Sequence, residues 1–477
     1  MTNKVYLEKR DCFEYPAPDA YFSPHVHYPE YPFSDDTISP YPNEVYDMVR
    51  ASLFGLGLDS ENYGNKRWNP LGDFVEPEAR ILLKPNWVYH SNRIGGLDCT
   101  VTHPSVIRCI IDYCIIAGAK LIEIGDAPIQ SCNLKSLLNK YGYNYIFEFI
   151  KKKGANVLVS DFRITVSKQI LKLVTIQRKT LNVDVVEFDL NGFSHFNNVS
   201  NKEKYRGLDY HDDKLNMRHH DGHHKYLITK SVFNADLIIN LPKPKSHRFA
   251  GITAAQKNFV GICSEKDYLP HYRLGAPEIG GDETNYTTLL VKFLSFINKQ
   301  RCKAIDKKNI IMQIFYGVIQ HGIQIIFAKK KYIHGRWHGN DTIWRTILDI
   351  NLILQYGNQD GTLNFDNHPR NILNIGDLII AGEKEGPMKP SPKLLGAILA
   401  SNNCVLFDYV FCKITRFDYN HIPSIKNALI DKLLFNDSLD KTFMRSNIKE
   451  LCNTALDNIS FPNDWAFKPH SVWKEIL

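Results

Sequence analysis

The sequence predicts an α/β protein with a doubly wound, mainly parallel sheet, helices on both faces and an inserted irregular or β segment. Three observations predict this fold. Short, almost wholly apolar runs at 80–84 (RILLK), 119–125 (AKLIEIG) and 236–241 (DLIINL) have the pattern of strands buried on both faces. Longer helical patterns alternate with such runs, which favours parallel strands. Each run is followed at once by a proline or a polar residue.

The first half of the chain supplies most of the predicted sheet. The first forty residues are rich in Pro, Tyr and Asp, and predict an irregular arm on the surface. Thr102 is the expected cap of a helix that has Pro104 in its first turn and ends at Gly118. The other elements expected here are helices over 43–58 and 133–152 and a strand over 155–160.

The second half interrupts the sheet and then resumes it. Residues 161–230 alternate short β-like runs with polar stretches, and predict an insertion over the sheet. Residues 284–340 are expected to be largely helical. The resumed elements are a helix over 342–354, strands over 372–381 and 394–401, and a helix over 403–414. The predicted organisation is an N-terminal arm and helix at 1–60, an α/β domain at 80–425 and a tail at 426–477.

Composition restricts the class of protein. Hydrophobic residues make up 44% and charged residues 23% of 477 positions, which excludes wholesale disorder. A net charge of +7 suits an anionic small molecule and is too diffuse to predict nucleic acid as a partner. Ten cysteines without a C-x-x-C pair predict buried thiols and no iron–sulfur cluster. Residues 1–16 lack the apolar core of a signal peptide, so the expected location is cytoplasmic.

Polar side chains gather where the predicted strands end. Because ligands of open parallel sheets bind outside the carboxyl ends of the strands, we expect these side chains to share one crevice. Several lysines there would repel one another unless an anion were bound. For a single lysine, exposure to solvent is the simpler explanation, but the joint pattern favours an anion site. Its expected members are Lys84, Asn86, His103, Asp126, Asn240, Lys243, Lys245, His247, Lys257 and Asn258.

The stretch KDYLPHYRLGAPEIGGDE is too polar for a core and is held by prolines and glycines, as functional loops commonly are. His271 is a candidate general acid or base, and Arg273 a candidate anion clamp. Asp282 and Glu283 are candidate ligands of a Mg²⁺-type ion.

Two further segments admit two interpretations each. The histidine- and acid-rich stretch 211–224 suits a divalent metal or a solvated loop, and the scattered spacing favours the loop. Residues 309–327 are moderately apolar, with Lys307–Lys308 before them and Lys329–Lys331 after them. A helix of this kind suits either an acidic membrane surface or packing on the protein itself.

Several motifs in order resemble the uncharacterised bacterial family called domain of unknown function 362. They are ILLKPN, THPSVIR, GAKLIEIGD, LIINLPKPKSH, GITAAQKNFVGI and GEKEGP, between about residues 80 and 422. The loop sequence above and GRWHGNDTIWR are similar to the branch found among surface-polysaccharide biosynthesis genes, without the ferredoxin-like module of some relatives. The resemblance also implies roles for Asp341, Arg345 and Glu383. Arg345 is a further candidate for the anion site, Asp341 is a further candidate metal ligand, and Glu383 is a further candidate catalytic residue.

These observations lead to three hypotheses. The first is an enzyme acting on a phosphorylated or nucleotide-linked sugar of surface-polysaccharide synthesis, in which lysines neutralise phosphate and His247 or His271 moves a proton. Asp126 or Glu383 would orient that histidine or hold Mg²⁺. The second is a non-catalytic binding or assembly factor at the inner membrane face. The third, iron–sulfur redox chemistry, is disfavoured by the cysteine spacing.

Overall fold

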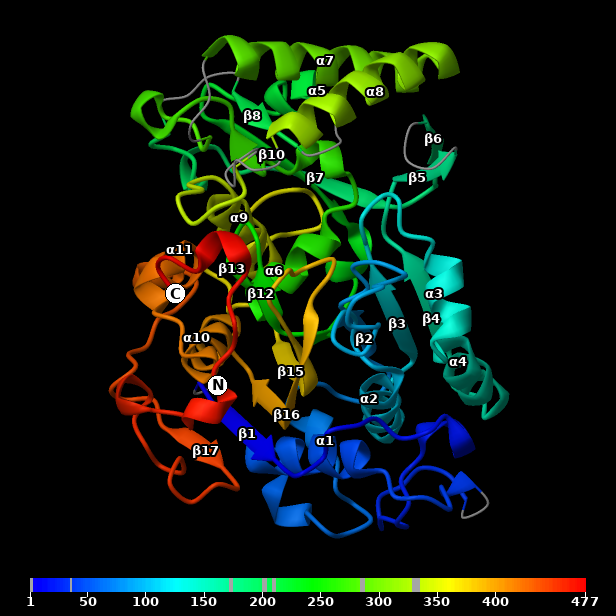
Figure 1. Cartoon of the computed structure of the whole chain (residues 1–477). Helices are drawn as coiled ribbons and strands as arrows, with labels where there is room; N and C mark the ends of the chain where they lie inside the picture. Colours follow the sequence, from blue (N-terminus) through cyan, green and yellow to red (C-terminus); the bar gives the residue numbers. More distant parts are fainter. Residues whose placement is uncertain are drawn as a thin grey trace.

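The computed structural model of the chain describes residues 3–34, 37–170, 175–199, 204–207, 212–283, 288–327 and 335–477. Its centre is a ten-stranded mixed sheet (Figure 1). The main path runs in the order β17 (Met444–Ser446), β1 (Val5–Lys9), β16 (Ser391–Ser401), β15 (Ile372–Glu383), β11 (Leu237–Leu241), β2 (Arg80–Pro85), β3 (Leu121–Asp126) and β4 (Val157–Asp161). Two short strands, β12 (Lys245–His247) and β13 (Gly251–Thr253), pair beside β15.

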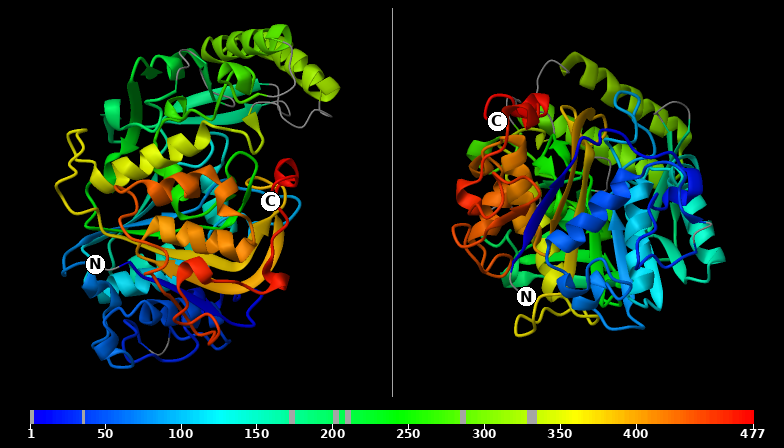
Figure 2. Two further views of the ribbon diagram at one scale, coloured as in Figure 1. Left: turned by 90° about the vertical axis from the view of Figure 1, so that its left-hand side faces the viewer. Right: turned by 90° about the horizontal axis from the view of Figure 1, so that it is seen from below.

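The strands from β15 to β4 are parallel neighbours, and β15, β11 and β2 at the centre are buried on both faces. Ile81 and Leu83 of β2 face one core and Leu82 faces the other, because side chains alternate along a strand. The first core is covered by α1 (Glu44–Gly55), α2 (Pro104–Ile116), α3 (Leu134–Lys140) and α4 (Tyr143–Lys152). The second is covered by α6 (Ala255–Asn258), α9 (Ile343–Tyr356), α10 (Cys404–Thr415) and α11 (Pro423–Ile430) (Figure 2, right). The predicted doubly wound α/β fold is confirmed.

The N-terminal arm differs from its prediction as a surface segment. β1 lies inside the sheet, antiparallel to β16 and parallel to β17, and its Val5 and Leu7 are fully buried. The strand is short and contains Tyr6, Glu8 and Lys9, so the sequence around it has no continuous apolar run. Its assignment depends on pairing with residues almost 400 positions away.

Two helical predictions need correction. His103, not Thr102, caps α2, because its side chain accepts the backbone N–H of Ser105. Thr102 instead donates its hydroxyl to the Leu241 carbonyl at 2.6 Å, which ties the start of α2 to the end of β11. The single helix expected over 133–152 is two helices, α3 and α4, because Gly142 between them has φ of 89°.

The segment predicted as an insertion carries small sheets of its own, above the main sheet in Figure 1. They are the hairpin β5 (Thr165–Ile170) and β6 (Thr175–Thr180), and the sheet of β7 (Val185–Asp189), β10 (His223–Thr229) and β9 (His219–His220). A further strand, β8 (Tyr205–Arg206), pairs with β14 (Tyr272–Arg273), which lies outside the predicted insertion. A short helix, α5 (Asp212–Asn216), and the helical pair α7 (Thr288–Asp306) and α8 (Ile310–Phe327) lie beside them.

All ten cysteines are free thiols, and Cys452 alone is exposed, as the scattered spacing predicts for buried thiols. Within the described residues, no helix combines the length and the hydropathy that crossing a membrane would require.

Candidate functional site

A cavity of about 370 Å³ opens outside the carboxyl ends of β2 and β3. Seven of the residues expected at the strand ends and in the following loop line it. They are Asn86, Asp126, Lys245, His247, Lys257, Asn258 and His271. Segments separated by up to 185 positions therefore meet here, because β2 and β3 end at this edge of the sheet and β12, α6 and the loop that carries His271 lie beside it.

Lys84 and Asp126 form the first buried ion pair beneath the cavity, at 2.8 Å between Nζ and Oδ1. The Lys84 ammonium also donates to the Pro85 carbonyl, and Asp126 accepts the Trp87 backbone N–H. Gly261 covers the pair so closely that a Cβ there would lie 2.0 Å from Asp126 Oδ1. The charge of Lys84 is therefore already neutralised by the protein.

Lys243 forms the second buried ion pair, with Asp377 of β15 at 2.9 Å. Tyr15, from the N-terminal arm, donates its hydroxyl to Asp377 and accepts from Lys243. The Tyr15 ring stacks on His103 at 3.8 Å between ring centroids. Burial and the neighbouring Lys243 charge lower the pKa of His103 well below its ordinary value. Lys243 and His103 lie behind the cavity and do not line it.

A chain of asparagine amides crosses the strand ends. Asn86 donates to Asn258, Asn258 donates to Asn240, and Asn240 donates to Asn374, each at 2.8 Å. Asn258 also donates to the Lys84 carbonyl at 3.1 Å. Because each amide is fixed by its neighbour, the polar wall of the cavity is rigid before any ligand binds.

Three cavity lysines have no carboxylate partner among the described residues. Lys245 donates to Asn86 Oδ1 at 3.0 Å and to the Lys243 carbonyl at 2.8 Å, and Lys266 donates to the Cys263 carbonyl at 3.3 Å. Lys257 makes neither a hydrogen bond nor an ion pair with any residue that the structure describes. Burial and neighbouring cations lower the pKa of Lys245 to about 7 and that of Lys257 to about 8.

The two cavity histidines are neutral and have opposite tautomers. His247 Nδ1 accepts the backbone N–H groups of Phe249 and Ala250, so the proton is on Nε2. His271 Nδ1 donates to the Leu269 carbonyl at 2.8 Å, so in the neutral ring its proton is on Nδ1. Burial and nearby cations lower the pKa of His247 well below its ordinary value and that of His271 to about 3.

The lining of the cavity also includes apolar side chains. They are Val88, Ile129, Phe249, Val260, Leu269 and Met388. A cavity lined by cationic, amide and apolar groups can hold a molecule with an anionic group and a less polar body.

Besides Lys84, His103, Asn240 and Lys243, which do not line the cavity, six more of the predicted site residues lie outside it. Arg273 makes ion pairs with Asp282 at 3.4 Å and with Asp341 at 2.7 Å, and Arg345 pairs with Asp341 at 3.0 Å. Glu283 accepts the Gly275 backbone N–H, and Glu383 accepts that of Lys468. Asp282 further accepts from Thr342 and the backbone of Asp341. These carboxylates therefore bind guanidinium, hydroxyl and backbone groups, and do not line the cavity with His247 and His271.

Sequence reasoning missed Arg248 and Lys266 of the lining, and Tyr15, Asn374 and Asp377 behind it. A signal for Asp377 exists, because one carboxylate interrupts an apolar run of β15 (NIGDLII). The arm residue Tyr15 has no such signal, because only the fold brings it to Lys243.

The histidine-rich stretch is not a solvated loop throughout. His219 and His224 point inward from β9 and β10 and are almost fully buried, and His219 donates to the Tyr268 carbonyl at 2.9 Å. His220 and His223 point outward, where His223 pairs with Asp189. His211 lies outside the described residues. Among the described ones no group of three metal-ligating side chains is found.

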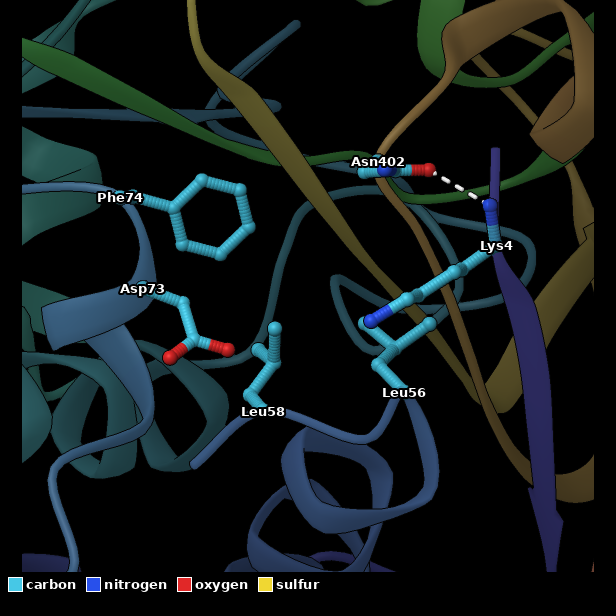
Figure 3. A pocket seen from close by; sticks show the side chains of 6 residues that line it. All are labelled: Lys4, Leu56, Leu58, Asp73, Phe74 and Asn402. Carbon is cyan, nitrogen blue, oxygen red and sulfur yellow. Dashed lines mark hydrogen bonds between the residues drawn. The ribbon is translucent and has the colours of Figure 1, made fainter. Parts of the chain in front are cut away.

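A second hollow, of about 220 Å³, lies at the other end of the sheet (Figure 3). It is lined by Lys4, Leu56, Leu58, Asp73, Phe74 and Asn402, and the Lys4 backbone donates to Asn402 at 2.8 Å. No predicted site residue lies there, so the strand-end cavity is the stronger candidate.

Comparison with known proteins gives one family and a few distant relatives. Residues 81–186 and 191–413, more than half of the chain, match the family described as Domain of unknown function (DUF362). A thylakoid-associated protein of Synechocystis is 22% identical over 398 residues, which cover 83% of this chain and 81% of that protein.

Two solved structures are similar at a lower level. A crystal structure of a Thermotoga maritima protein has 10% identity and a TM-score of 0.31, covering 73% of this chain and 54% of that one. The lactate racemase apoprotein of Thermoanaerobacterium thermosaccharolyticum has 16% identity and a TM-score of 0.21, covering 46% and 37%. The matches thus span about half of the first solved chain and less of the second, and scores this low say nothing about the site.

Proposed function

We propose that this chain, which belongs to the Domain of unknown function (DUF362) family, is an enzyme that binds a phosphorylated or nucleotide-linked sugar in the strand-end cavity. The observation that supports it most is that some of the strand-end lysines are paired with carboxylates and others are not. Lys84 and Lys243 have carboxylate partners, whereas Lys245, Lys257 and Lys266 lack one among the described residues.

Three unneutralised ammonium groups around one cavity raise the free energy of the unliganded protein, because burial disfavours charge and like charges repel. A phosphate group would remove both costs and gain charge-assisted hydrogen bonds. The N–H at His247 Nε2 suits a hydrogen bond to a leaving or carbonyl oxygen, so the proposed catalytic role of His247 is to stabilise the negative charge that develops there. The apolar side chains of the lining would contact the less polar face of the sugar or base.

A thermal-shift series tests the proposal. Inorganic phosphate, glucose 1-phosphate and UDP-glucose should each raise the melting temperature, and glucose alone should not. Lys257→Met should abolish the shift, whereas Lys426→Met, at an exposed position of α11, should leave it unchanged. Equal shifts in both variants, or no shift with any anion, would refute an anion site in this cavity.

A second candidate function, attachment to an acidic membrane surface, is favoured by one face of α8. Ile311, Ile314, Phe315 and Val318 are exposed, and their spacing places them on a single helical stripe. The exposed Lys307 and Lys308 precede the stripe, and the relative from Synechocystis is named as thylakoid-associated. Lys329–Lys331 lie outside the described residues. An apolar stripe with adjacent cations suits insertion among acidic headgroups.

Flotation with liposomes tests this attachment. The protein should float with vesicles rich in phosphatidylglycerol and not with phosphatidylcholine alone, and Ile311→Ser/Phe315→Ser/Val318→Ser should stay in the soluble fraction. Flotation of this variant equal to that of the parent would show that the stripe is not the membrane contact.

A further inference from the structure

Lys257 is placed differently from every other lysine around the cavity. Lys84 and Lys243 are paired with carboxylates, and Lys245 and Lys266 donate to oxygen atoms of the protein. Lys257 lines the cavity and has no hydrogen bond or ion pair with any described residue. Its amine is therefore the cavity nitrogen that is least committed to the fold.

The short helix that carries Lys257 is fixed from two sides. Asp408 of α10 accepts the backbone N–H of Ala255 at 2.6 Å and the side-chain amide of Gln256 at 3.2 Å. On the other side, Asn258 is held in the amide chain across the strand ends. A rigid backbone on both sides of Lys257 limits the positions that its amine can reach.

The surroundings of Lys257 increase the share of its side chain that is an unprotonated amine. Burial, followed by the charges of Lys266 and Arg248, lowers its pKa to about 8. At pH 7.5 roughly a quarter of such groups carry no proton, against about one in a thousand for an ordinary lysine. A desolvated lysine beside other cations is a common arrangement for an amine nucleophile.

We propose that Lys257 is a nucleophile that forms an imine with the carbonyl carbon of a phosphorylated aldehyde or ketone. The substrate class rests on the proposed function, since Lys245 and Lys266 would hold the phosphate. The Lys257 nitrogen adds to the carbonyl carbon and the carbonyl oxygen takes up a proton, which gives a carbinolamine. Loss of the hydroxyl with one further proton releases water and leaves the C=N bond.

His247 can assist this sequence through a hydrogen bond. Its Nε2 carries the proton, Nδ1 is held by two backbone N–H groups, and the ring lines the same cavity as Lys257. The Nε2–H can therefore stabilise the negative charge that develops on the carbonyl oxygen. The two protons that leave the Lys257 nitrogen are the two that the oxygen takes up, so protons balance with water as the sole product besides the imine. The imine is reversible by hydrolysis along the same path.

Borohydride trapping tests this inference. The full chain is incubated with glyceraldehyde 3-phosphate or pyridoxal 5′-phosphate, reduced with sodium borohydride and mapped by peptide mass spectrometry. We expect one secondary amine per chain at Lys257, suppressed by excess inorganic phosphate. The non-phosphorylated aldehydes should need concentrations at least tenfold higher.

Two variants make the result specific. Lys257→Arg keeps the positive charge but removes the nucleophile, so phosphate should still raise the melting temperature while the adduct disappears. Lys426→Arg, at the exposed position of α11, should keep both. A phosphate shift without an adduct at Lys257, or an adduct spread over surface lysines, would overturn the imine inference and leave the anion site standing. An adduct at Lys257 that ignores phosphate would confirm the amine and refute the phosphate site.

Discussion

Lys257→Met should stabilise the unliganded protein, although most substitutions at a cavity wall destabilise. The pKa of Lys257 is lowered from 10.5 to about 8, mainly by burial. At neutral pH this difference corresponds to about 3 kcal/mol of unfavourable free energy for the charged side chain. The side chain is only partly buried, and solvent screening reduces the effect, so we expect a gain of about 1–3 kcal/mol. Methionine has a similar length, and no hydrogen bond among the described residues is lost.

The matched control is Lys84→Met, at another strand-end lysine. Removing Lys84 leaves Asp126 buried without its cation, which costs about 3–5 kcal/mol. In urea denaturation at pH 7 in a sulfate-free buffer, the free energy of unfolding should therefore be higher than that of the parent for Lys257→Met and lower for Lys84→Met. If Lys257→Met destabilises the protein as Lys84→Met does, the view that Lys257 is an unneutralised charge is wrong.

Three further outcomes follow from the same contacts. Sulfate, a dianion at all the pH values used, should bind more weakly as pH rises from 6 to 9 in titration calorimetry, because Lys245 and Lys257 lose protons near pH 7 and 8; constant affinity over that range would contradict these pKa values. Gly261→Ala should weaken sulfate binding at least tenfold in the same assay, because the new Cβ would collide with Asp126. His195, between two carboxylates that raise its pKa to about 9 against the effect of burial, stabilises the fold below pH 6.5 and loses this contribution as pH rises through 9. His195→Gln should therefore cost about 2–3 kcal/mol in urea denaturation at pH 6 and much less at pH 10, and an equal loss at both would refute this ion-pair role.

The parallel core and the strand-end cavity could be predicted because both depend on local patterns. An apolar run such as Ile81–Leu83 specifies a buried strand, and the residue after it is placed at the sheet edge by the fold class alone. Six lining residues were found among the strand-end motifs, and His271 was found in the polar loop sequence. The neutralisation of Lys84 and Lys243 could not be predicted, because it depends on which carboxylate lies opposite each ammonium across neighbouring strands.

Other features were missed because they depend on contacts with residues far along the chain, or on the direction in which a side chain points in the folded protein. β1 is a strand because it pairs with β16, which lies almost 400 residues later in the sequence. His219 and His224 are core residues because the β9–β10 hairpin turns them inward, although their composition suggests a solvated loop. The arginine–aspartate cluster around Arg273 was expected near the cavity, but its acids and arginines pair with one another.

Sulfate binding measured with proton uptake tests the central claim most directly. Calorimetric titrations at pH 7.5 in two buffers of different ionisation enthalpy give both the affinity and the number of protons taken up. Because pKa values near 7 for Lys245 and near 8 for Lys257 leave these groups partly unprotonated, one bound sulfate should draw in about one proton in total. Saturable binding with that uptake, lost in Lys257→Met, is the predicted result. Absence of binding, or binding without proton uptake, would contradict the claim that the cavity lysines without carboxylate partners form an anion-binding site.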